Sequence, residues 1–396
     1  MNARALLAGE DAGLRFDTLP PLSLYVHLPW CVRKCPYCDF NSYEARGALP
    51  DDEYVAALLR DLRAELPLVQ GRRIETIFFG GGTPSLFSGA AIARLLEGLR
   101  AELDLAPDVE VTLEANPGAV DAARFETFRA AGVKRLSIGI QSFRDERLRS
   151  LGRVHDAAEA EAAVTMARAA GFENVNLDLM YGLPNDDAAG AVADLERALA
   201  LAPSHLSWYQ LTLEPNTAFH RTPPALPGDD VVARTEEQGR ALLAAQGFER
   251  YEVSAYAQRG RRCLHNLNYW QFGDYVGLGA GAHGKITLPG EGVIARRAKT
   301  RNPRTYLNCA GSAAAATEER VATQPQAALE LLMNALRLLD GMPAAVFAAR
   351  AGQPVTGIAA PRSRAIARGW LHAEPDTLRA TPAGLQQLNR VLELFA

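Results

Sequence analysis

Three cysteines stand close together near the start of the chain, in the run HLPWCVRKCPYCDF. Cys31, Cys35 and Cys38 have the spacing Cys-x3-Cys-x2-Cys and follow a short apolar segment. Thiolates are preferred ligands of iron–sulfur clusters, and a cubane of four irons needs four ligands. Three cysteines therefore leave one iron open to a ligand that is not protein. A redox Cys-x2-Cys pair, or half of a zinc site, would leave the third cysteine unexplained.

Chemically active residue types also recur at the ends of predicted strands. Runs rich in Val, Ile, Leu and aromatic residues predict strands over residues 22–28, 74–80, 109–116, 135–141, 174–180 and 205–213. The cysteines follow the first strand and the turn GGGTP (80–84) follows the second. Glu114, Gln141 and Asp178 close the next three strands. Active sites of β/α barrels are built from the carboxyl ends of the strands, so we predict one shared site.

Two glycine-rich segments have different interpretations. The three glycines of GGGTP let the backbone approach a ligand closely and present N–H groups to an anionic or carboxylate end. A tight strand–helix turn is the structural alternative. GLGAGAH (277–283) superficially resembles a dinucleotide fingerprint, but it lacks the strand-to-helix context and the acidic residue of that motif. We interpret it as a turn with close packing.

Amphipathic helices are predicted between the strands. Apolar residues repeat at helical spacing at Val55, Leu58, Leu59, Leu62 and Leu66, and again at Ile92, Leu95, Leu96, Leu99 and Leu103. Asp51, Ser88 and Asp121 are the expected N-caps. This alternation predicts parallel strands with crossover helices, an α/β fold of the partial (β/α)6 barrel type. A complete barrel and a doubly wound open sheet share the same periodicity.

The pattern changes along the chain and divides it into four parts. We predict an N-terminal tail (1–21), a β/α barrel (22–257), a less regular connecting region (258–323) and a C-terminal domain (324–396). The last part combines helices with a short wing-like hairpin, which predicts a mainly helical, winged-helix-like domain. Its arginines are mixed with acidic residues, so we expect a structural or lid role and not DNA binding.

Bulk composition narrows the class of protein. A net charge of -4 and a pI near 6.0 over 396 residues give no electrostatic footprint for a nucleic-acid partner. The first residues lack a secretory apolar core, and no run reaches the length of a membrane span. Five cysteines, two of them isolated, do not form a disulfide pattern. We therefore predict a cytoplasmic protein in a reducing environment.

Several motifs together resemble a known family. The cysteine spacing followed by GGGTP on a β/α repeat is similar to the radical S-adenosylmethionine (SAM) proteins. YVHLPWCVRKCPYCDF, FFGGGTPS, LEANP, IGIQSF, LGRVH and LDLMYGLP resemble the oxygen-independent coproporphyrinogen III oxidase group, over residues 22–290. The resemblance implies a [4Fe-4S] cluster whose open iron binds SAM. It also implies that electron transfer from the cluster cleaves SAM to a 5′-deoxyadenosyl radical.

The resemblance assigns roles to individual residues. It implies that the cluster is bound by Cys31, Cys35 and Cys38. It implies that the cluster-bound SAM is held by Tyr25, Gly81, Gly82, Thr83 and Glu114, and that a second SAM contacts Tyr37, Gln141, Arg153 and Asp178. Two of these have structural alternatives: Tyr25 as a packed strand residue and Arg153 as a solvated helix charge.

Two departures and one further motif point within this group to its haem-chaperone branch. The oxidases have a cysteine where this chain has Phe40, and they carry a longer segment before the first strand. The run HNLNYW resembles the HNxxYW mark of the chaperone branch, with the haem-binding candidates His265, Asn266, Tyr269 and Trp270. An imidazole beside aromatic rings suits haem iron and a porphyrin face, although such a histidine is often only a core residue. His283 and Cys263 are competing axial candidates.

We therefore expect a binding protein and not an enzyme. It would take up haem as cargo and pass it to a haem-accepting protein, peripherally at the inner face of the membrane. An electron donor such as a flavodoxin or ferredoxin would be a further partner. The alternative is an oxidase that decarboxylates the propionates of coproporphyrinogen III, and a third hypothesis is a radical SAM enzyme with another substrate.

Overall fold

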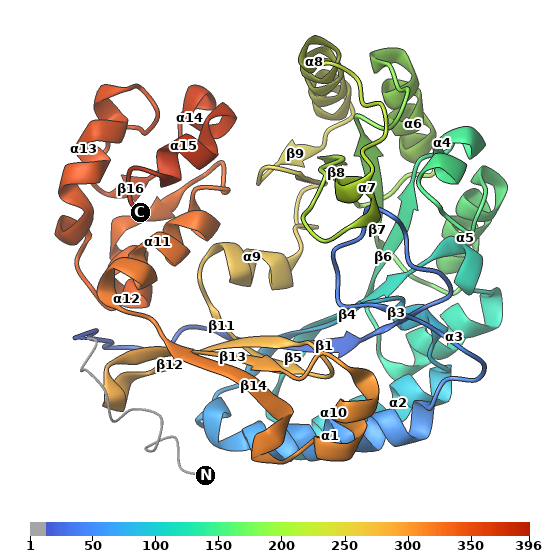
Figure 1. Ribbon diagram of the computed structural model, residues 1–396, viewed down its shortest axis with the longest axis horizontal. Helices are drawn as coiled ribbons and strands as arrows, with labels where there is room; N and C mark the ends of the chain where they lie inside the picture. Colours follow the sequence, from blue (N-terminus) through green and yellow to red (C-terminus); the bar gives the residue numbers. More distant parts are fainter. Residues whose placement is uncertain (1–12) are drawn as a thin grey trace.

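The computed structural model describes residues 13–396. Over these residues the largest sheet has twelve strands in the order β14-β13-β12-β11-β1-β4-β5-β6-β7-β8-β10-β9 (Figure 1). The strands are β1 (Leu22–Leu28), β4 (Ile74–Gly81), β5 (Leu105–Ala115), β6 (Arg135–Gln141), β7 (Asn174–Tyr181), β8 (His205–Gln210), β9 (Glu249–Arg250), β10 (Ala255–Ala257), β11 (Asp274–Leu278), β12 (His283–Leu288), β13 (Val293–Lys299) and β14 (Ala316–Val321). The predicted N-terminal tail lies mostly outside the described residues.

The central strands run parallel, as the alternation of strands and helices predicted. Strands β1 and β4 to β8 are parallel neighbours, and β11 continues this arrangement beside β1. Antiparallel strands extend both sides, with β12 to β14 beyond β11 and β10 with β9 beyond β8. Because β14 and β9 remain as edges, the sheet is an open, partial barrel and not a complete one.

Helices cover the outer face of the curved sheet (Figure 1). They are α1 (Asp51–Val69), α2 (Gly89–Glu102), α3 (Ala122–Ala131), α4 (Asp145–Ser150), α5 (Ala157–Ala169), α6 (Ala188–Ala200) and α8 (Asp229–Ala245). Ser88 and Asp121 cap α2 and α3, as expected, by accepting the backbone N–H groups of Ala91 and Arg124. The expectation for Asp51 was wrong. It is the first residue of α1, and its carboxylate accepts the Ser88 backbone N–H instead.

The alternation of side chains along the parallel strands separates core from site. Successive strand residues point to opposite faces of a sheet. One set is apolar and packs with the helices, for example Leu113 on β5, Ile138 on β6 and Leu177 on β7. The other set includes Glu114 and Asp178, which line a cavity on the concave side. The same strands therefore build the main core and the polar interior.

The C-terminal residues form a second core with mainly helical walls. Its elements are α11 (Gln324–Ala335), β15 (Met342–Pro343), α12 (Ala344–Ala351), α13 (Ala359–Ala367), β16 (Thr377–Leu378), α14 (Pro382–Gln386) and α15 (Leu388–Leu392). The expected hairpin is present, since the His372 N–H donates to the Arg379 carbonyl. Leu14, near the start of the described chain, is buried in this second core. No helix within residues 13–396 is long and apolar enough to cross a membrane.

Helix α9 (Leu264–Trp270) joins the two parts. It lies between the sheet and the C-terminal helices (Figure 1). On one side His265 is hydrogen-bonded to Thr76 of β4, with 2.7 Å between Nδ1 and Oγ1. On the other side the Arg337 guanidinium lies over the Trp270 ring, 4.4 Å from its centroid. The HNxxYW motif is therefore a bridge between the barrel and the C-terminal domain.

Candidate functional site

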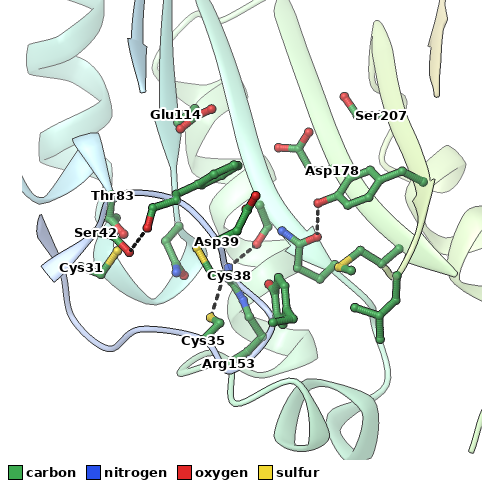
Figure 2. Close-up of a pocket in the computed structure, with 18 of the residues that line it drawn as sticks. Cys31, Cys35, Cys38, Asp39, Ser42, Thr83, Glu114, Arg153, Asp178 and Ser207 are labelled. Carbon is green, nitrogen blue, oxygen red and sulfur yellow. Dashed lines mark hydrogen bonds between the residues drawn. The ribbon is translucent and has the colours of Figure 1, made fainter. Parts of the chain in front are cut away.

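A cavity of about 470 Å³ opens at the carboxyl ends of the parallel strands. Figure 2 shows the cysteine loop on one side of it and side chains from β5, β7 and β8 on the other. Ten of the predicted site residues line it: Cys31, Cys35, Cys38, Tyr37, Gly82, Thr83, Glu114, Gln141, Arg153 and Asp178. Two predicted SAM residues, Tyr25 and Gly81, line a neighbouring cavity instead. The structure thus brings most of the predicted strand-end residues together around one cavity.

The cysteine loop is closed by its own backbone. Cys31 pairs with Glu44 between the short strands β2 (Trp30–Cys31) and β3 (Tyr43–Glu44), and the Cys38 N–H donates to the Cys35 carbonyl at 3.1 Å. All three thiols are free and half-buried. Burial raises the pKa of the Cys31 thiol, which hydroxyl groups of Thr83 and Ser42 partly offset. Burial also raises the pKa of Cys38.

The donor set suits a cluster better than a single ion. Among the described residues, no group of three His, Cys, Asp or Glu side chains is arranged to hold one metal ion. A cubane places each thiolate on a different iron, so its ligands must surround the cluster and need not converge on one point. Three half-buried cysteines around one cavity meet this requirement, and we conclude that the residues fit the group.

Arg153 is half-buried beside the cysteines and is not a solvated helix charge. Its Nη1 lies 3.7 Å from the Cys35 sulfur, and its Nη2 donates to the Gly139 carbonyl at 2.5 Å. Tyr37 lines the same cavity, and burial raises the pKa of its phenol. The guanidinium is thus held against the Cys35 sulfur by a contact with the barrel.

Two carboxyl groups face the cavity from β5 and β7. Glu114 accepts the Gly81 backbone N–H at 3.2 Å. Burial, and then the nearby Asp178, raise the pKa of Glu114 to about 8. Asp178 accepts hydrogen bonds from Ser137 at 2.9 Å and Asn176 at 2.8 Å, while burial raises its pKa. A cationic ligand in the cavity would therefore stabilise the ionised forms of these two carboxyl groups.

The glycines of GGGTP are needed for close packing. Gly81 has a φ of +118°, and a Cβ there would lie 2.6 Å from the His27 ring. A Cβ on Gly82 would lie 2.6 Å from the Trp30 carbonyl oxygen. The Gly81 N–H is already bonded to Glu114. The turn thus brings β4 against the loop that follows β1, and both interpretations of GGGTP describe part of its role.

Gln141 ends β6 with an unusual backbone. Its φ of 71° lies in the left-handed region, which is costly for a residue other than glycine and is common at functional sites. Its side-chain oxygen accepts a hydrogen bond from the Tyr209 hydroxyl at 3.0 Å. Tyr209 and Ser207 of β8 also line the cavity and were not predicted. Extending the strand-end rule to the sixth strand would have found Tyr209.

A second cavity, of about 470 Å³, lies next to the first. Asp39, Phe40 and Glu114 line both. The other walls come from β1, β4, β11 to β14, α9 and the neighbouring loops. They include Tyr25, His27, Asn41, Gly81, Tyr269, Tyr275, Gly281, His283, Ala298, Lys299, Arg301 and Thr317. No local sequence pattern indicates that this cavity lies beside the cysteine loop, because its walls lie far apart along the chain.

The four haem-binding candidates of the HNxxYW motif differ in how accessible their side chains are to a ligand. His265 is only 1% exposed, its Nε2 is buried without a hydrogen-bond partner, and burial lowers its pKa to about 3. Tyr269 reaches the second cavity, whereas Trp270 packs under Arg337. Asn266 is half-buried, and its backbone N–H donates to the Cys263 sulfur.

The two competing axial candidates also differ. Cys263 is fully buried, and burial raises the pKa of its thiol to about 12. Its sulfur lies 3.7 Å from Glu110 Oε1. His283, at the start of β12, is exposed and lines the second cavity. The GLGAGAH segment that precedes it is a tight turn, as predicted, with positive φ at Gly279 and Gly281.

An open β/α barrel with three cysteines at the carboxyl ends of its strands defines a class, the radical SAM proteins. The profile of the Radical SAM superfamily matches residues 25–197, and that of the HemN C-terminal domain matches residues 322–386. Coproporphyrinogen III oxidase (HemN) from Escherichia coli, described as a radical SAM enzyme, has the same fold. The TM-score is 0.81 at 23% sequence identity, covering 98% of this chain and 93% of that one.

Sequence relatives identify the family within this class. Heme chaperone HemW from Escherichia coli K12 is 50% identical over 377 residues, which is 95% of this chain and 98% of that protein. Heme chaperone HemW from Haemophilus influenzae is 46% identical over 381 residues, again 95% and 98%. The chain belongs to the HemW family of radical SAM proteins.

Proposed function

We propose that this protein is a haem chaperone that binds haem and delivers it to an acceptor protein. The observation that carries the proposal is membership of a family whose curated members are named heme chaperones, over 95% of the chain. Phe40 supports it, because the loop has no fourth cysteine two positions after Cys38. An acceptor at the inner face of the membrane and an electron donor such as a flavodoxin or ferredoxin complete the proposal.

The first cavity is the proposed site of a [4Fe-4S] cluster and SAM. Cys31, Cys35 and Cys38 would bind three irons, and an iron–sulfur cluster supplies one-electron chemistry there when bound. Glu114 would accept a hydrogen bond from the SAM ammonium, and Thr83 offers a buried hydroxyl beside Cys31. Arg153 would hold negative charge near the cluster, while Gln141 and Tyr209 shape the far wall.

Coproporphyrinogen III decarboxylation is the second candidate function. The fold shared with HemN and the carboxyl groups in the first cavity favour it. Both functions require a porphyrin-like ligand, so ligand binding alone does not separate them.

One experiment separates the two functions. The anaerobically reconstituted protein is titrated with hemin, and then mixed with a haem-free globin as a trap. A chaperone gives a saturable Soret band that moves to the globin. A parallel incubation with coproporphyrinogen III, SAM and a reductant gives no vinyl groups. Vinyl formation at a catalytic rate would overturn the proposal, as would failure of the protein to bind hemin.

A further inference from the structure

One histidine differs from the rest in having free ring nitrogens beside a cavity. All seven histidines lie within residues 13–396. His27 and His205 use both ring nitrogens in hydrogen bonds, and His155 and His265 are buried. His220 and His372 line neither the first nor the second cavity. Within the described chain, the imidazole of His283 makes no hydrogen bond or ion pair, and the residue lines the second cavity.

The walls beside His283 are aromatic. The rings of Tyr269 and Tyr275 meet edge to face, with centroids 4.6 Å apart. Tyr25 lines the same cavity, and Phe40 lines both cavities while 57% exposed. Such an exposed large apolar side chain is informative when it borders a cavity. A cavity of about 470 Å³ with aromatic side chains along one part of its wall has the size of a site for a flat aromatic ligand that also carries polar groups.

A basic recess of about 200 Å³ adjoins the other side of His283. It is lined by Arg296, Arg297 and Arg320, together with Tyr275. Each arginine also meets a carboxylate: Glu330 contacts Arg296 and Arg320, and Glu65 contacts Arg297.

The recess can still accept a second anion. A guanidinium has five donors in a planar fork, and Glu330 is shared between two arginines. Donors therefore remain for an anionic group that enters between Arg296 and Arg320. His283 stands where an aromatic cavity meets a basic recess.

We propose that haem lies across this junction with its iron bound by the imidazole of His283. The porphyrin face packs against Tyr269 and Tyr275, and the propionates reach Arg296 and Arg320. The inference rests on the proposed function and names the site of its cargo. The iron exchanges a solvent ligand for an imidazole nitrogen, so no oxidant or reductant is consumed. Imidazole is a common axial ligand of haem iron.

The same geometry gives His265 a different role. Its ring lies between Phe78, at 5.0 Å, and Tyr269, at 4.8 Å, and Nδ1 is held by Thr76. Iron could reach its buried Nε2 only if α9 moved, whereas His283 is already exposed. His265 is therefore a positioning residue, which holds the Tyr269 ring at the wall of the second cavity.

The test compares three single variants of the full-length protein in hemin titrations. His283→Ala is expected to lose the imidazole-ligated Soret and electron paramagnetic resonance signals and to weaken hemin binding on the order of tenfold or more. His265→Ala is expected to keep the ligation signal, with a lower melting temperature. His220→Ala, an exposed histidine outside both cavities, is the matched control and should resemble the parent protein.

Three outcomes would overturn or relocate the site. Unchanged ligation in His283→Ala overturns the proposal. Loss of ligation in folded His265→Ala, judged by circular dichroism, assigns the iron to the motif histidine instead. If the parent protein binds no hemin, the proposed function itself fails, and that result is distinct from either of the others.

The basic recess has its own test. Haem dimethyl ester lacks the propionate charges, so it should bind the parent protein more weakly than haem does. Arg296→Gln with Arg320→Gln should remove most of this difference, whereas Arg147→Gln with Arg149→Gln, on α4 and outside both the recess and the second cavity, should preserve it. Equal discrimination in both double variants would show that the propionates lie elsewhere.

Discussion

The Arg153 guanidinium lies 3.7 Å from the sulfur of Cys35, the middle cysteine of the loop. The same side chain is fixed by the Gly139 carbonyl on β6, so the cation is held by the barrel and not by the loop. A thiolate bound to iron carries negative charge, which a fixed cation nearby stabilises. The barrel thereby places a cation beside one of the three cysteines that would bind iron.

We predict that Arg153→Gln impairs cluster assembly. The variant keeps a hydrogen-bonding side chain but leaves the Cys35 thiolate without its neighbouring cation. Reconstitution with iron and sulfide should be slower and should yield less iron per chain. Arg149→Gln, an exposed neighbour, is the control, and equal iron contents in the two variants would contradict the prediction.

A second prediction concerns Glu114 and SAM. Because burial raises the pKa of Glu114 to about 8, this carboxyl group is mostly protonated in the free protein at neutral pH. Ionisation is needed to receive the SAM ammonium, so SAM affinity should increase as the pH rises from 6.5 to 8.5. Glu114→Gln should bind SAM weakly and without this pH dependence, as measured by calorimetry on the reconstituted protein. A parent protein with pH-independent affinity would refute the role of Glu114.

The same shift predicts how stability depends on pH. A group whose pKa is raised by folding contributes stability that is fully present below its unfolded pKa, near 4.5, and is lost as the pH rises through about 8. The free energy of unfolding should therefore fall across this window, by at most about 5 kcal/mol from this group. Glu114→Gln should flatten the curve, although Asp178, whose pKa is also raised, keeps part of the slope. Urea titrations at several pH values measure the free energy of unfolding and its dependence on pH.

The fold was largely predictable because its signals are local. Each parallel strand carries its own apolar run, and each crossover helix its own apolar face, so the alternation appears within short windows. The outer strands of the sheet were harder to predict from the sequence. Strands β12 to β14 pair with their neighbours in sequence, but they join the parallel sheet only because β11 returns beside β1, a contact between segments far apart in the chain. Nothing in the local pattern fixes that return.

The site was predicted only in part, for a related reason. Glu114, Gln141 and Asp178 meet because strand ends share one edge, a rule that a sequence reveals. The rule does not show which of the two cavities a residue of β1 lines. Tyr25, which was predicted at the shared site, lines the second cavity. The strand-end rule also does not show whether a side chain is buried or exposed. His265 and His283 look alike as sequence letters, yet one is enclosed by Phe78 and Tyr269 and the other is exposed.

A third prediction concerns the buried ion pair beneath the site. Asp274 accepts the Lys285 ammonium at 2.7 Å, Arg72 at 2.7 Å and the Thr287 N–H at 2.8 Å. Burial opposes ionisation of Asp274, but Lys285 and Arg72 together lower its pKa. Asp274→Asn should cost about 3–5 kcal/mol in urea unfolding, because Lys285 is left as an uncompensated buried charge.

An exposed pair provides the matched control for this substitution. Asp104 meets Arg73 at 3.1 Å, with both side chains more than half exposed. Asp104→Asn should cost about 0–1 kcal/mol, since solvent screens the pair. Similar losses in the two variants would mean that the buried pair gives no special stability.

The fourth prediction separates the two cavities. Cys38→Ser should lose the cluster, because each thiolate binds a different iron and serine is a poor replacement. The loss of unfolding free energy should be small, since Cys38 is half-buried at the surface of the barrel. Cys309→Ser removes a half-buried cysteine far from the loop in sequence and should retain the iron and sulfide content of the parent protein.

Because the second cavity contains none of the three cysteines, Cys38→Ser should still bind hemin with the His283 ligation signal. Loss of that signal in the folded variant would mean that the cluster itself shapes the haem site, through the Asp39 and Phe40 wall that the two cavities share.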